Sequence, residues 1–516
     1  MALLLGIDVG TSSTKALVID DAGRVLERAS SPHTLEQPYA GWSEQDPRQW
    51  WSATVAATRA VTERLGARTG EIEAVGLSGQ MHGSVLLARE SFGGSGERAE
   101  PLRPAILWND QRTAAQCETI ERAAGSRRRL VEMVGNAALP GFTLPKLLWV
   151  REHEAEVWQR TAMVMLPKDY VRFRLTGRAA TDVGDGAGTL LLDVDRRSWS
   201  DEAMRLFDID PATLPPVLES AAAAGEVTAW AASQTGLPAG ITVAAGSGDN
   251  QCGAVGAGVV ESGVALATLG TSGVLYAHAS EPRLDLGPDE RSAGRIHTMC
   301  AADGEAGRKG EWCLTGCMLS AAGSLQWVHD RLFPGESVDR LIAEASGAPP
   351  GCEGLVFLPH LTGERCPHPD PLARGAWIGL TSRHSRAHLV RSVLEGVTFT
   401  MRAILDLFVD TGIDANAVRL GGGGARSELW RQMQADIYRR PVCLPNTEEG
   451  PALGAALLGG VAAGVWESVP AACRACIRIT ETREPDRATA DRYEPMRLVH
   501  RTLYPRLREA FHSLSA

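Results

Sequence analysis

Residues 3–19 read LLLGIDVGTSSTKALVI, and a similar pattern returns at residues 264–276 as VALATLGTSGVLY. In each copy an apolar run ends in a Gly-Thr-Ser turn, and a second apolar run follows. This pattern predicts a hairpin whose turn exposes backbone N–H groups and hydroxyls. One such hairpin would be an ordinary surface turn. Two copies, one in each half of the chain, favour a duplicated α/β fold that holds a polyphosphate from both sides.

The length of the chain predicts two domains of similar size. Its 516 residues exceed what one hydrophobic core usually serves. Glycines around Gly246 interrupt the pattern of strands and helices. We therefore expect an N-terminal domain over 1–245, a C-terminal domain over 246–470 and a helical tail over 471–516. Apolar residues at helical spacing within 491–513 indicate that this tail packs on the body of the protein.

Composition excludes several classes of function. The net charge is −10, which disfavours nucleic-acid binding because that binding uses a basic surface. The longest apolar run, Pro451–Trp466, is short for a membrane span and holds four glycines, so it predicts a helix packed closely on its neighbours. The start of the chain has no basic segment typical of a signal peptide. We expect a cytoplasmic protein with no membrane partner, in which Cys473 and Cys476 are structural.

The first half alternates predicted strands with predicted helices. Residues 74–77 and 105–108 have the pattern of short buried strands, and residues 143–156 and 157–174 have helical patterns. Ligands of open α/β sheets bind beyond the carboxyl ends of the strands. Polar residues that follow the two strands are therefore candidates for a binding site.

Amide, imidazole, carboxylate and indole groups follow these two strands. Such groups bind polyols by hydrogen bonds and by stacking on a sugar face. A single histidine here would more often be a buried core residue, but five polar or aromatic groups at one edge favour a ligand. The candidates are Gln80, His82, Trp108, Asn109 and Asp110.

Two aspartates are candidates for phosphoryl-transfer chemistry. Asp8 lies where a predicted strand meets the first turn and could hold Mg²⁺, while Lys15 on the returning strand could add charge for a phosphate. Asp249 follows a glycine-rich break, where it could be a helix N-cap or the base that takes a proton from a substrate hydroxyl. Phosphoryl transfer through a loose transition state needs little early deprotonation, so a carboxylate that orients the hydroxyl is sufficient.

A third glycine-rich segment, Gly421–Gly424, lies between a predicted strand and a predicted helix. Glycines at a helix N-terminus let a nucleotide approach the backbone closely. The segment is also similar to a dinucleotide fingerprint, with Glu448 at a suitable distance, but Ser427 replaces the third glycine. NAD binding is therefore a competing interpretation of this loop.

Together these segments resemble the FGGY carbohydrate kinases, which belong to the actin-like and hexokinase-like ATPases with a duplicated RNase-H-like fold. Residues 141–153 (GFTLPKLLWVREH) and 375–395 (GAWIGLTSRHSRAHLVRSVLE) are similar to the two signatures of this family. Members for glycerol carry Arg-Glu where this chain has Met81-His82. The resemblance implies ATP- and Mg²⁺-dependent phosphorylation of a ketopentose, D-xylulose, at its C5 hydroxyl, in a chain that could be a homodimer.

The resemblance also implies roles for individual residues. Asp249 would accept the proton and Asp8 would act near Mg²⁺. Met81, His82 and Asn250 would join the sugar site. The phosphates and the adenosine would be bound by Thr11, Ser12, Ser13, Lys15, Gly270, Thr271, Gln326, Gly423, Gly424 and Ser427.

Three other functions stay open on the sequence alone. A kinase for another ketose or a polyol such as ribulose or a glycerol-like substrate would share the phosphate-binding residues. An NAD-dependent oxidoreductase would rest on Gly421–Gly424 and would leave Asp8 and Asp249 without a role. An ATPase switch of the actin or chaperone type would keep the turns but would not need the polar edge.

Overall fold

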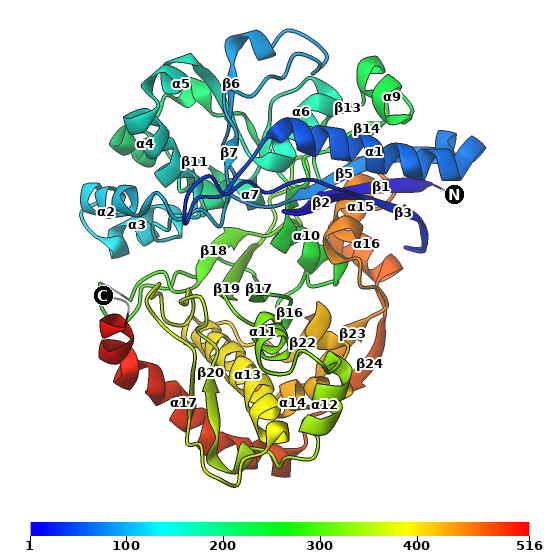
Figure 1. Ribbon diagram of the computed structural model, residues 1–516. Helices are drawn as coiled ribbons and strands as arrows, with labels where there is room; N and C mark the ends of the chain where they lie inside the picture. Colours follow the sequence, from blue (N-terminus) through cyan, green and yellow to red (C-terminus); the bar gives the residue numbers. More distant parts are fainter. Residues whose placement is uncertain (1, 291, 515–516) are drawn as a thin grey trace. The chain divides into compact units, whose positions relative to one another are not determined.

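The computed structural model describes residues 2–290 and 292–514, and the chain forms two compact units. The first unit comprises Met1–Val260, Ser280–Cys313 and Glu449–Ile477. The second comprises Glu261–Ala279, Leu314–Glu448 and Arg478–Ala516. Figure 1 labels the helices and strands of both units.

A central sheet organises the first unit. Its strands are β1 (Leu3–Val9), β2 (Ser13–Asp20), β3 (Val25–Pro32), β5 (Ile72–Gly79), β13 (Ala223–Glu226), β14 (Thr242–Ala244) and β15 (Ser247–Gly248). Their order is β3-β2-β1-β5-β14-β13, and β15 pairs with the end of β5. β1 runs antiparallel to β2 and parallel to β5, so the predicted hairpin of residues 3–19 is confirmed.

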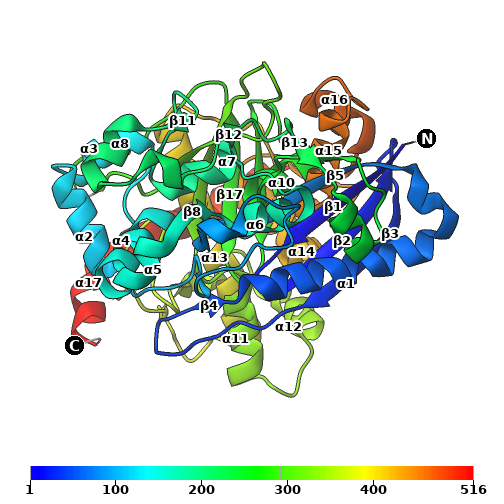
Figure 2. The same ribbon diagram turned by 90° about the horizontal axis from the view of Figure 1, so that it is seen from above.

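Helices and short strands surround this sheet. The helices are α1 (Pro47–Leu65), α2 (Ala114–Ala123), α3 (Arg127–Val134), α4 (Thr143–His153), α5 (Ala155–Arg160), α6 (Pro167–Thr176), α7 (Val183–Gly186), α8 (Asp201–Phe207), α9 (Ala229–Thr235), α10 (Asp249–Gly256), α15 (Gly450–Ala462) and α16 (Val469–Cys476). The short strands are β4 (Glu44–Gln45), β6 (Val85–Ala88), β7 (Ala105–Ile106), β8 (Thr161–Met165), β9 (Thr181–Asp182), β10 (Leu192–Asp193), β11 (Ser198–Trp199), β12 (Val217–Leu218) and β18 (His297–Cys300). Viewed from above, α1 runs along β2 and β3 (Figure 2).

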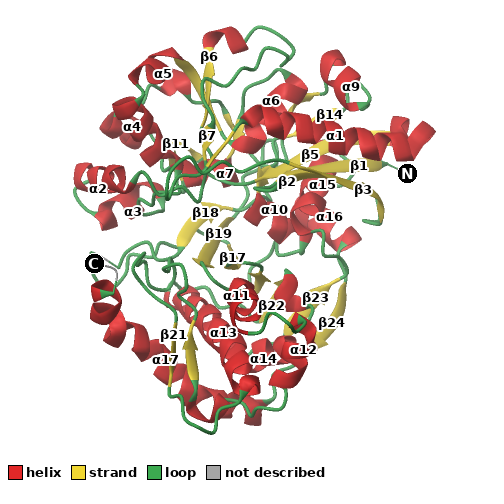
Figure 3. Ribbon diagram, in the orientation of Figure 1, coloured by secondary structure: helices red, strands yellow, loops and turns green. Residues whose placement is uncertain are grey.

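The second unit repeats the strand order of the first. Its strands are β16 (Val264–Leu269), β17 (Gly273–Ala279), β19 (Trp312–Met318), β20 (Val356–Leu358), β21 (Ala376–Ile378), β22 (Ala417–Gly421), β23 (Val442–Pro445) and β24 (Ile479–Arg483). Its helices are α11 (Ala322–Leu332), α12 (Val338–Ala345), α13 (Arg386–Asp410), α14 (Glu428–Tyr438) and α17 (Arg487–Ser513). Six strands of a seven-stranded sheet, in the order β19-β17-β16-β22-β23-β24, match β3-β2-β1-β5-β14-β13 strand for strand, and Figure 3 shows the strands in yellow. The predicted duplication is therefore confirmed.

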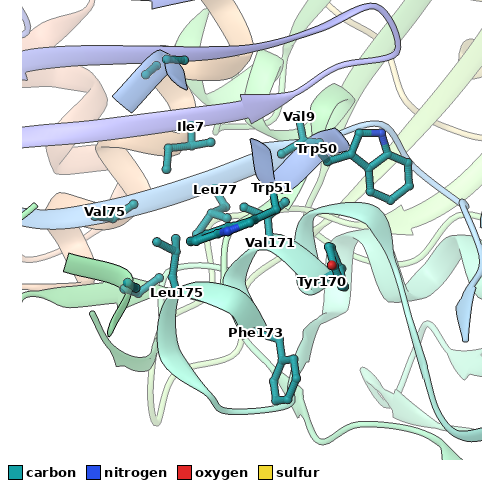
Figure 4. Packing of buried hydrophobic residues seen from close by; sticks show 14 of the residues in the cluster. Ile7, Val9, Trp50, Trp51, Val75, Leu77, Tyr170, Val171, Phe173 and Leu175 are labelled. Atoms are coloured by element: carbon teal, nitrogen blue, oxygen red, sulfur yellow. The ribbon is translucent and has the colours of Figure 1, made fainter. Parts of the chain in front are cut away.

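Alternate residues of β1 face two different helical layers. Leu5, Ile7 and Val9 are fully buried in a cluster with residues of α1 and α6, and Figure 4 shows Ile7 and Val9 in this cluster together with Trp50 and Trp51. Leu4 points to the opposite layer, which contains α15. A strand covered on both faces is apolar along its covered length, which explains the run of apolar residues from Leu3 to Ile7 that precedes Asp8.

Glycines let α15 approach the sheet closely. A Cβ added at Gly76 would lie 1.7 Å from the carbonyl oxygen of Ala455, and one at Gly6 would lie 1.9 Å from that of Ala452. These distances leave no room for a side chain at either position of the sheet. The expectation of a small-residue helix packed on its neighbours within residues 451–466 is confirmed, but the helix ends at Ala462.

The compact units differ from the proposed division at residues 245 and 470. Asp249 lies within the first unit because β15 and α10 continue from its central sheet. The segment Glu449–Ile477 also belongs to this unit because α15 packs on β1 and β5. The tail is divided between the units, with α16 in the first and α17 in the second.

Two local predictions were wrong. Residues 161–165, expected within a helix, form β8, which pairs with β6. The strand expected at residues 105–108 is only two residues long as β7, and it pairs with β4 rather than with the central sheet. In both cases a cross-strand partner distant in the sequence decides the structure of a short apolar run.

Among the described residues, no helix has both the length and the apolar character that a membrane span requires.

Candidate active site

Three chain segments end at one edge of the first sheet and bring both predicted aspartates there. Asp8 is the penultimate residue of β1, and it aligns with Ser78 of the parallel strand β5. The Ser78 hydroxyl donates a hydrogen bond of 2.8 Å to the Asp8 carboxylate. Ser247 of β15 also aligns with Ser78, and Asp249 follows as the first residue of α10. The carboxyl ends of these strands therefore form the edge where ligands of α/β sheets bind.

The two aspartates interact electrostatically. Burial raises the pKa of Asp8 above its usual value, although the Ser78 hydrogen bond and the charge of Lys15 oppose this effect. Burial is also the main reason why the pKa of Asp249 rises to about 7, and the negative charge of Asp8 raises it further. Both residues are half-buried, so a ligand can still reach them. Gly248, not Asp249, is the N-cap of α10, and the backbone N–H groups of Asp249 and Asn250 oppose the rise in the pKa of the Asp249 carboxylate.

A buried ionic cluster supports the chain segment that carries Asp249. The Lys168 ammonium contacts Asp169 at 2.6 Å, Asp182 at 2.7 Å and Asp185 at 3.6 Å, and none of these side chains is exposed. Asp182 also accepts a hydrogen bond of 2.7 Å from Ser247, two residues before Asp249. Burial raises the pKa of Asp185 well above its usual value, and Asp249 is among the negative charges that add to this rise.

A second buried network connects the first turn to the residues that follow β5. The Gln45 amide donates to the carbonyl oxygen of Thr11 at 2.6 Å and accepts from Gln80 at 2.8 Å. The Thr11 hydroxyl donates to Gln80 and accepts from the Trp108 indole at 3.1 Å. Trp50 on α1 donates to the Gln45 side-chain oxygen at 3.0 Å. The fully buried amide of Gln45 thus fixes the first turn and the residues predicted to bind the sugar relative to each other.

Met81 and His82 are held next to this edge. The Asn250 amide lies 3.6 Å from the Met81 sulfur as a hydrogen-bond donor, so a neighbour of Asp249 contacts Met81. His82 has a φ of 70°, which is unusual for a residue with a side chain. Its ring packs edge-on against Phe142, with centroids 4.7 Å apart.

The residues predicted to bind the sugar differ in their hydrogen bonds to other residues of the protein. The Asp110 carboxylate is fully buried and accepts hydrogen bonds from Arg112 and from the backbone of Ser43. Gln80 is also buried and bonded, as described above. The side-chain oxygen of Asn109, by contrast, is buried without a hydrogen-bond partner among the described residues. The structure gives Asp110 and Gln80 a supporting role, and their direct contact with a sugar stays a prediction.

The first turn presents hydroxyls and a paired cation. Gly10 donates its backbone N–H to Ser13 at 3.1 Å, which closes the turn and leaves Ser12 exposed. Lys15 is half-exposed and forms an ion pair of 2.9 Å with Glu449. Glu449 also pairs with Arg28. A phosphate at this turn would therefore compete with Glu449 for the Lys15 ammonium.

The second unit brings its predicted nucleotide residues together around the second turn. The carbonyl oxygens of Gly270 and Thr271 accept backbone N–H groups from the start of α11, at 2.9 Å from Ala322 and 2.8 Å from Ala321. A Cβ added at Gly424 would lie 2.6 Å from the Cβ of Leu269, whereas the nearest atom to one at Gly423 would be 4.0 Å away.

Two further predicted nucleotide residues already have partners within the second unit. The Ser427 hydroxyl caps α14 by accepting from Trp430 at 3.2 Å. Gln326 is exposed on α11 and donates to Asp330 at 2.8 Å. A nucleotide contact at either side chain stays a prediction.

Several supporting residues were missed from the sequence. Gln45, Ser78, Lys146 and Lys168 all contact the site segments through hydrogen bonds or ion pairs to residues distant along the chain. The one available signal was that Lys146 lies within the family-like segment 141–153.

Comparison with known proteins agrees with this arrangement. The N-terminal domain of the FGGY family of carbohydrate kinases matches residues 3–256, and its C-terminal domain matches residues 265–463. The chain therefore belongs to the FGGY family of carbohydrate kinases and is a sugar phosphotransferase.

Similar individual proteins cover nearly the whole chain. A xylulose kinase of Escherichia coli (strain K12) is 39% identical, with 98% of this chain and 99% of the relative aligned. A xylulose kinase of Bacillus subtilis (strain 168) is 37% identical over 98% of this chain and 97% of the relative. The crystal structure of a xylulose kinase from Rhodospirillum rubrum superposes with a TM-score of 0.88 at 29% identity, covering 99% of this chain and 100% of that chain.

The side chains at the sheet edge fit a divalent cation. Asp8 and Asp249 are half-buried carboxylates, and the pKa of Asp249 is raised mainly by burial and further by repulsion from Asp8. A bound cation would relieve this repulsion, and carboxylate oxygen is the donor that Mg²⁺ prefers. Exposed glycine backbone at Gly423 likewise suits the close approach of a nucleotide.

Proposed function

We propose that this chain transfers the γ-phosphoryl group of ATP to the C5 hydroxyl of D-xylulose. The observation that carries the proposal is the placement of Asp249, with its pKa raised to about 7, at the same sheet edge as Asp8, Met81 and His82. The xylulose kinases that are 37% and 39% identical over nearly their full length supply the choice of sugar. No feature of the described residues favours an oxidoreductase over this assignment.

We assign the role of catalytic base to Asp249. A carboxylate whose pKa is near 7 is ionised to a useful degree at neutral pH and accepts a proton more readily than an ordinary aspartate. Its contact with the sugar hydroxyl orients the oxygen toward the phosphorus and receives the proton as the new P–O bond forms. The Lys168 cluster holds the preceding Ser247 through Asp182, which keeps the base in position.

We assign binding of the cation to Asp8 and binding of the phosphates to the two turns. Mg²⁺ bound there would neutralise charge on the transferring phosphoryl group. Within the first unit, the hydroxyls of Thr11 and Ser12 and the ammonium of Lys15 are available for phosphate oxygens once Lys15 leaves Glu449. Within the second unit, we assign binding of the nucleotide to Thr271 and Gly423.

We assign binding of the sugar to His82, Met81, Asn109 and Asn250. A neutral imidazole and an amide can each donate and accept hydrogen bonds, which suits the hydroxyl and keto groups of a ketopentose. The unpartnered side-chain oxygen of Asn109 supplies a further acceptor. Trp108 directs its indole N–H to Thr11, so its ring contributes shape rather than a hydrogen bond.

A substrate panel tests the proposal. Sugar-dependent ADP release should be highest with D-xylulose and lower with D-ribulose and glycerol, and ³¹P NMR of the product should identify a 5-phosphate. A preference for another ketose or a polyol would overturn the choice of sugar but leave a sugar kinase. NAD⁺ reduction without ADP release would overturn the kinase assignment.

A pair of matched variants tests the base. Asp249→Asn should lower turnover by roughly 10³-fold or more, because the hydroxyl loses its proton acceptor, while ATP binding is retained. Asp195→Asn is the control, since Asp195 is an exposed aspartate of the same unit. Near-normal turnover of Asp249→Asn would remove this residue from catalysis.

A further inference from the structure

His82 adopts a backbone conformation that is uncommon for a residue with a side chain. Its φ of 70° lies in the left-handed region, where residues with a Cβ are uncommon and are held by surrounding contacts. The carbonyl group of His82 is therefore expected to need partners that keep this peptide unit from rotating.

Two side chains from the start of α4 bond to that carbonyl oxygen. The Lys146 ammonium donates to it at 2.9 Å, and the Thr143 hydroxyl donates to it at 3.0 Å. Lys146 also donates to the carbonyl oxygen of Gly141 at 2.8 Å, which ties the beginning of its own helix to the same point. Both side chains are completely buried, so these bonds are shielded from water.

The imidazole ring of His82 is confined from two further sides. Phe142, next to Thr143, meets the ring edge-on at a centroid distance of 4.7 Å. A Cβ added at Gly188 would lie 2.2 Å from Nδ1 of the ring, so only glycine at that position allows the ring to lie there. The backbone and the ring are thus fixed together.

We propose that Lys146 and Thr143 are positioning residues for the sugar, which they affect by holding the carbonyl group of His82. The two residues, called the His82 clamp below, do not contact the substrate themselves. Loss of the clamp lets the peptide unit that follows His82 rotate and moves the imidazole away from the sugar. The inference rests on the proposed sugar-binding role of His82.

Steady-state kinetics of three variants test the clamp. Lys146→Met and Thr143→Val each remove one donor, and the sugar KM should rise roughly 10-fold or more in each, because a small displacement of a binding group weakens the substrate contacts. The ATP KM should change by less than about twofold, since the clamp lies on the sugar side. Thr143→Ser keeps the hydroxyl and should restore the sugar KM. Equal changes in both KM values, or no rescue by Thr143→Ser, would overturn the proposal.

A matched control separates positioning from helix stability. Arg151 also lies on α4 and donates to a backbone carbonyl, that of Phe207 at 2.9 Å, but it has no bond to His82. Arg151→Met should leave both KM values unchanged. A rise in sugar KM for Arg151→Met equal to that of Thr143→Val would show that general loosening of α4 is responsible.

NMR of the His82 ring tests the His82 clamp without an enzyme assay. The ¹H–¹³C signal of the ring, assigned by its loss in His82→Gln, should shift in Thr143→Val and return in Thr143→Ser. An unchanged signal in Thr143→Val would overturn the clamp even if the protein phosphorylates D-xylulose. A shifted and rescued signal in a protein that rejects D-xylulose would instead retain the clamp and overturn only the proposed substrate.

Discussion

Replacing Asp249 with asparagine should stabilise the protein, and the gain should grow with pH. Folding raises the pKa of Asp249 from 3.8 to about 7, so the folded state binds this proton more tightly than the unfolded state. Between these two values a rise in pH removes the proton from the unfolded chain first, and stability is lost as pH rises. Asparagine carries no such proton and escapes this loss.

The size of the effect follows from the shift. Each pKa unit corresponds to about 1.4 kcal/mol, so a shift of about 3 units sets a ceiling of roughly 4 kcal/mol above pH 7. Because the carboxylate is half-buried, solvent screening reduces the expected gain to about 2 kcal/mol at pH 8.5. Well below pH 3.8 the Asp249 side chain is neutral in both the folded and the unfolded state, and the gain should vanish.

Urea unfolding of both proteins without Mg²⁺ provides the measurement. Most of the 13 tryptophans lie in the first unit, so tryptophan fluorescence mainly follows the unit that contains Asp249. The difference in unfolding free energy between Asp249→Asn and the unchanged protein should increase between pH 4 and pH 8.5. Asp195→Asn, on the exposed surface, should show no such increase. A difference that stays constant or shrinks as pH rises would refute the electrostatic reasoning.

Two other substitutions have clear outcomes. Gly76→Ala should lower stability by roughly 3 kcal/mol or prevent folding, because its Cβ would lie 1.7 Å from the carbonyl oxygen of Ala455. Gly70→Ala, with no atom within 4 Å, is its control in urea unfolding, and equal stability of the two variants would contradict the close packing of α15. Gly423→Ala should leave stability unchanged, since its Cβ meets no protein atom closer than 4.0 Å, but should raise the ATP KM roughly 10-fold by blocking nucleotide approach. An unchanged ATP KM in this variant would move the nucleotide away from Gly423.

The duplicated hairpins were predictable because their signal is local. An apolar run, a Gly-Thr-Ser turn and a second apolar run determine β1 and β2, and β1 has the predicted bounds Leu3–Val9. The placement of Asp8 and Asp249 at one edge followed from the general behaviour of strand ends in α/β sheets. The strand β8 was missed because its pairing with β6 joins residues more than 70 positions apart.

The supporting residues could not be predicted for a related reason. Gln45 links Thr11, Gln80 and Trp50 only because three separate segments meet around it in the folded unit. A single sequence shows a polar residue at such a position, but it does not show the hydrogen-bond partners that offset the cost of burying it. The glycine content of α15 predicted close packing, yet not that Gly6 and Gly76 of the first unit would receive it.

The late position of α15 in the sequence has a consequence for biosynthesis. When the ribosome has released residues 1–260, β1 and β5 are complete, but the helix that covers one face of them begins only at Gly450. Leu4, Ala74 and the bare backbone at Gly76 therefore stay without their native cover while roughly 190 more residues are made. The amino-terminal half of this enzyme must wait for nearly the whole chain before its own folding can finish.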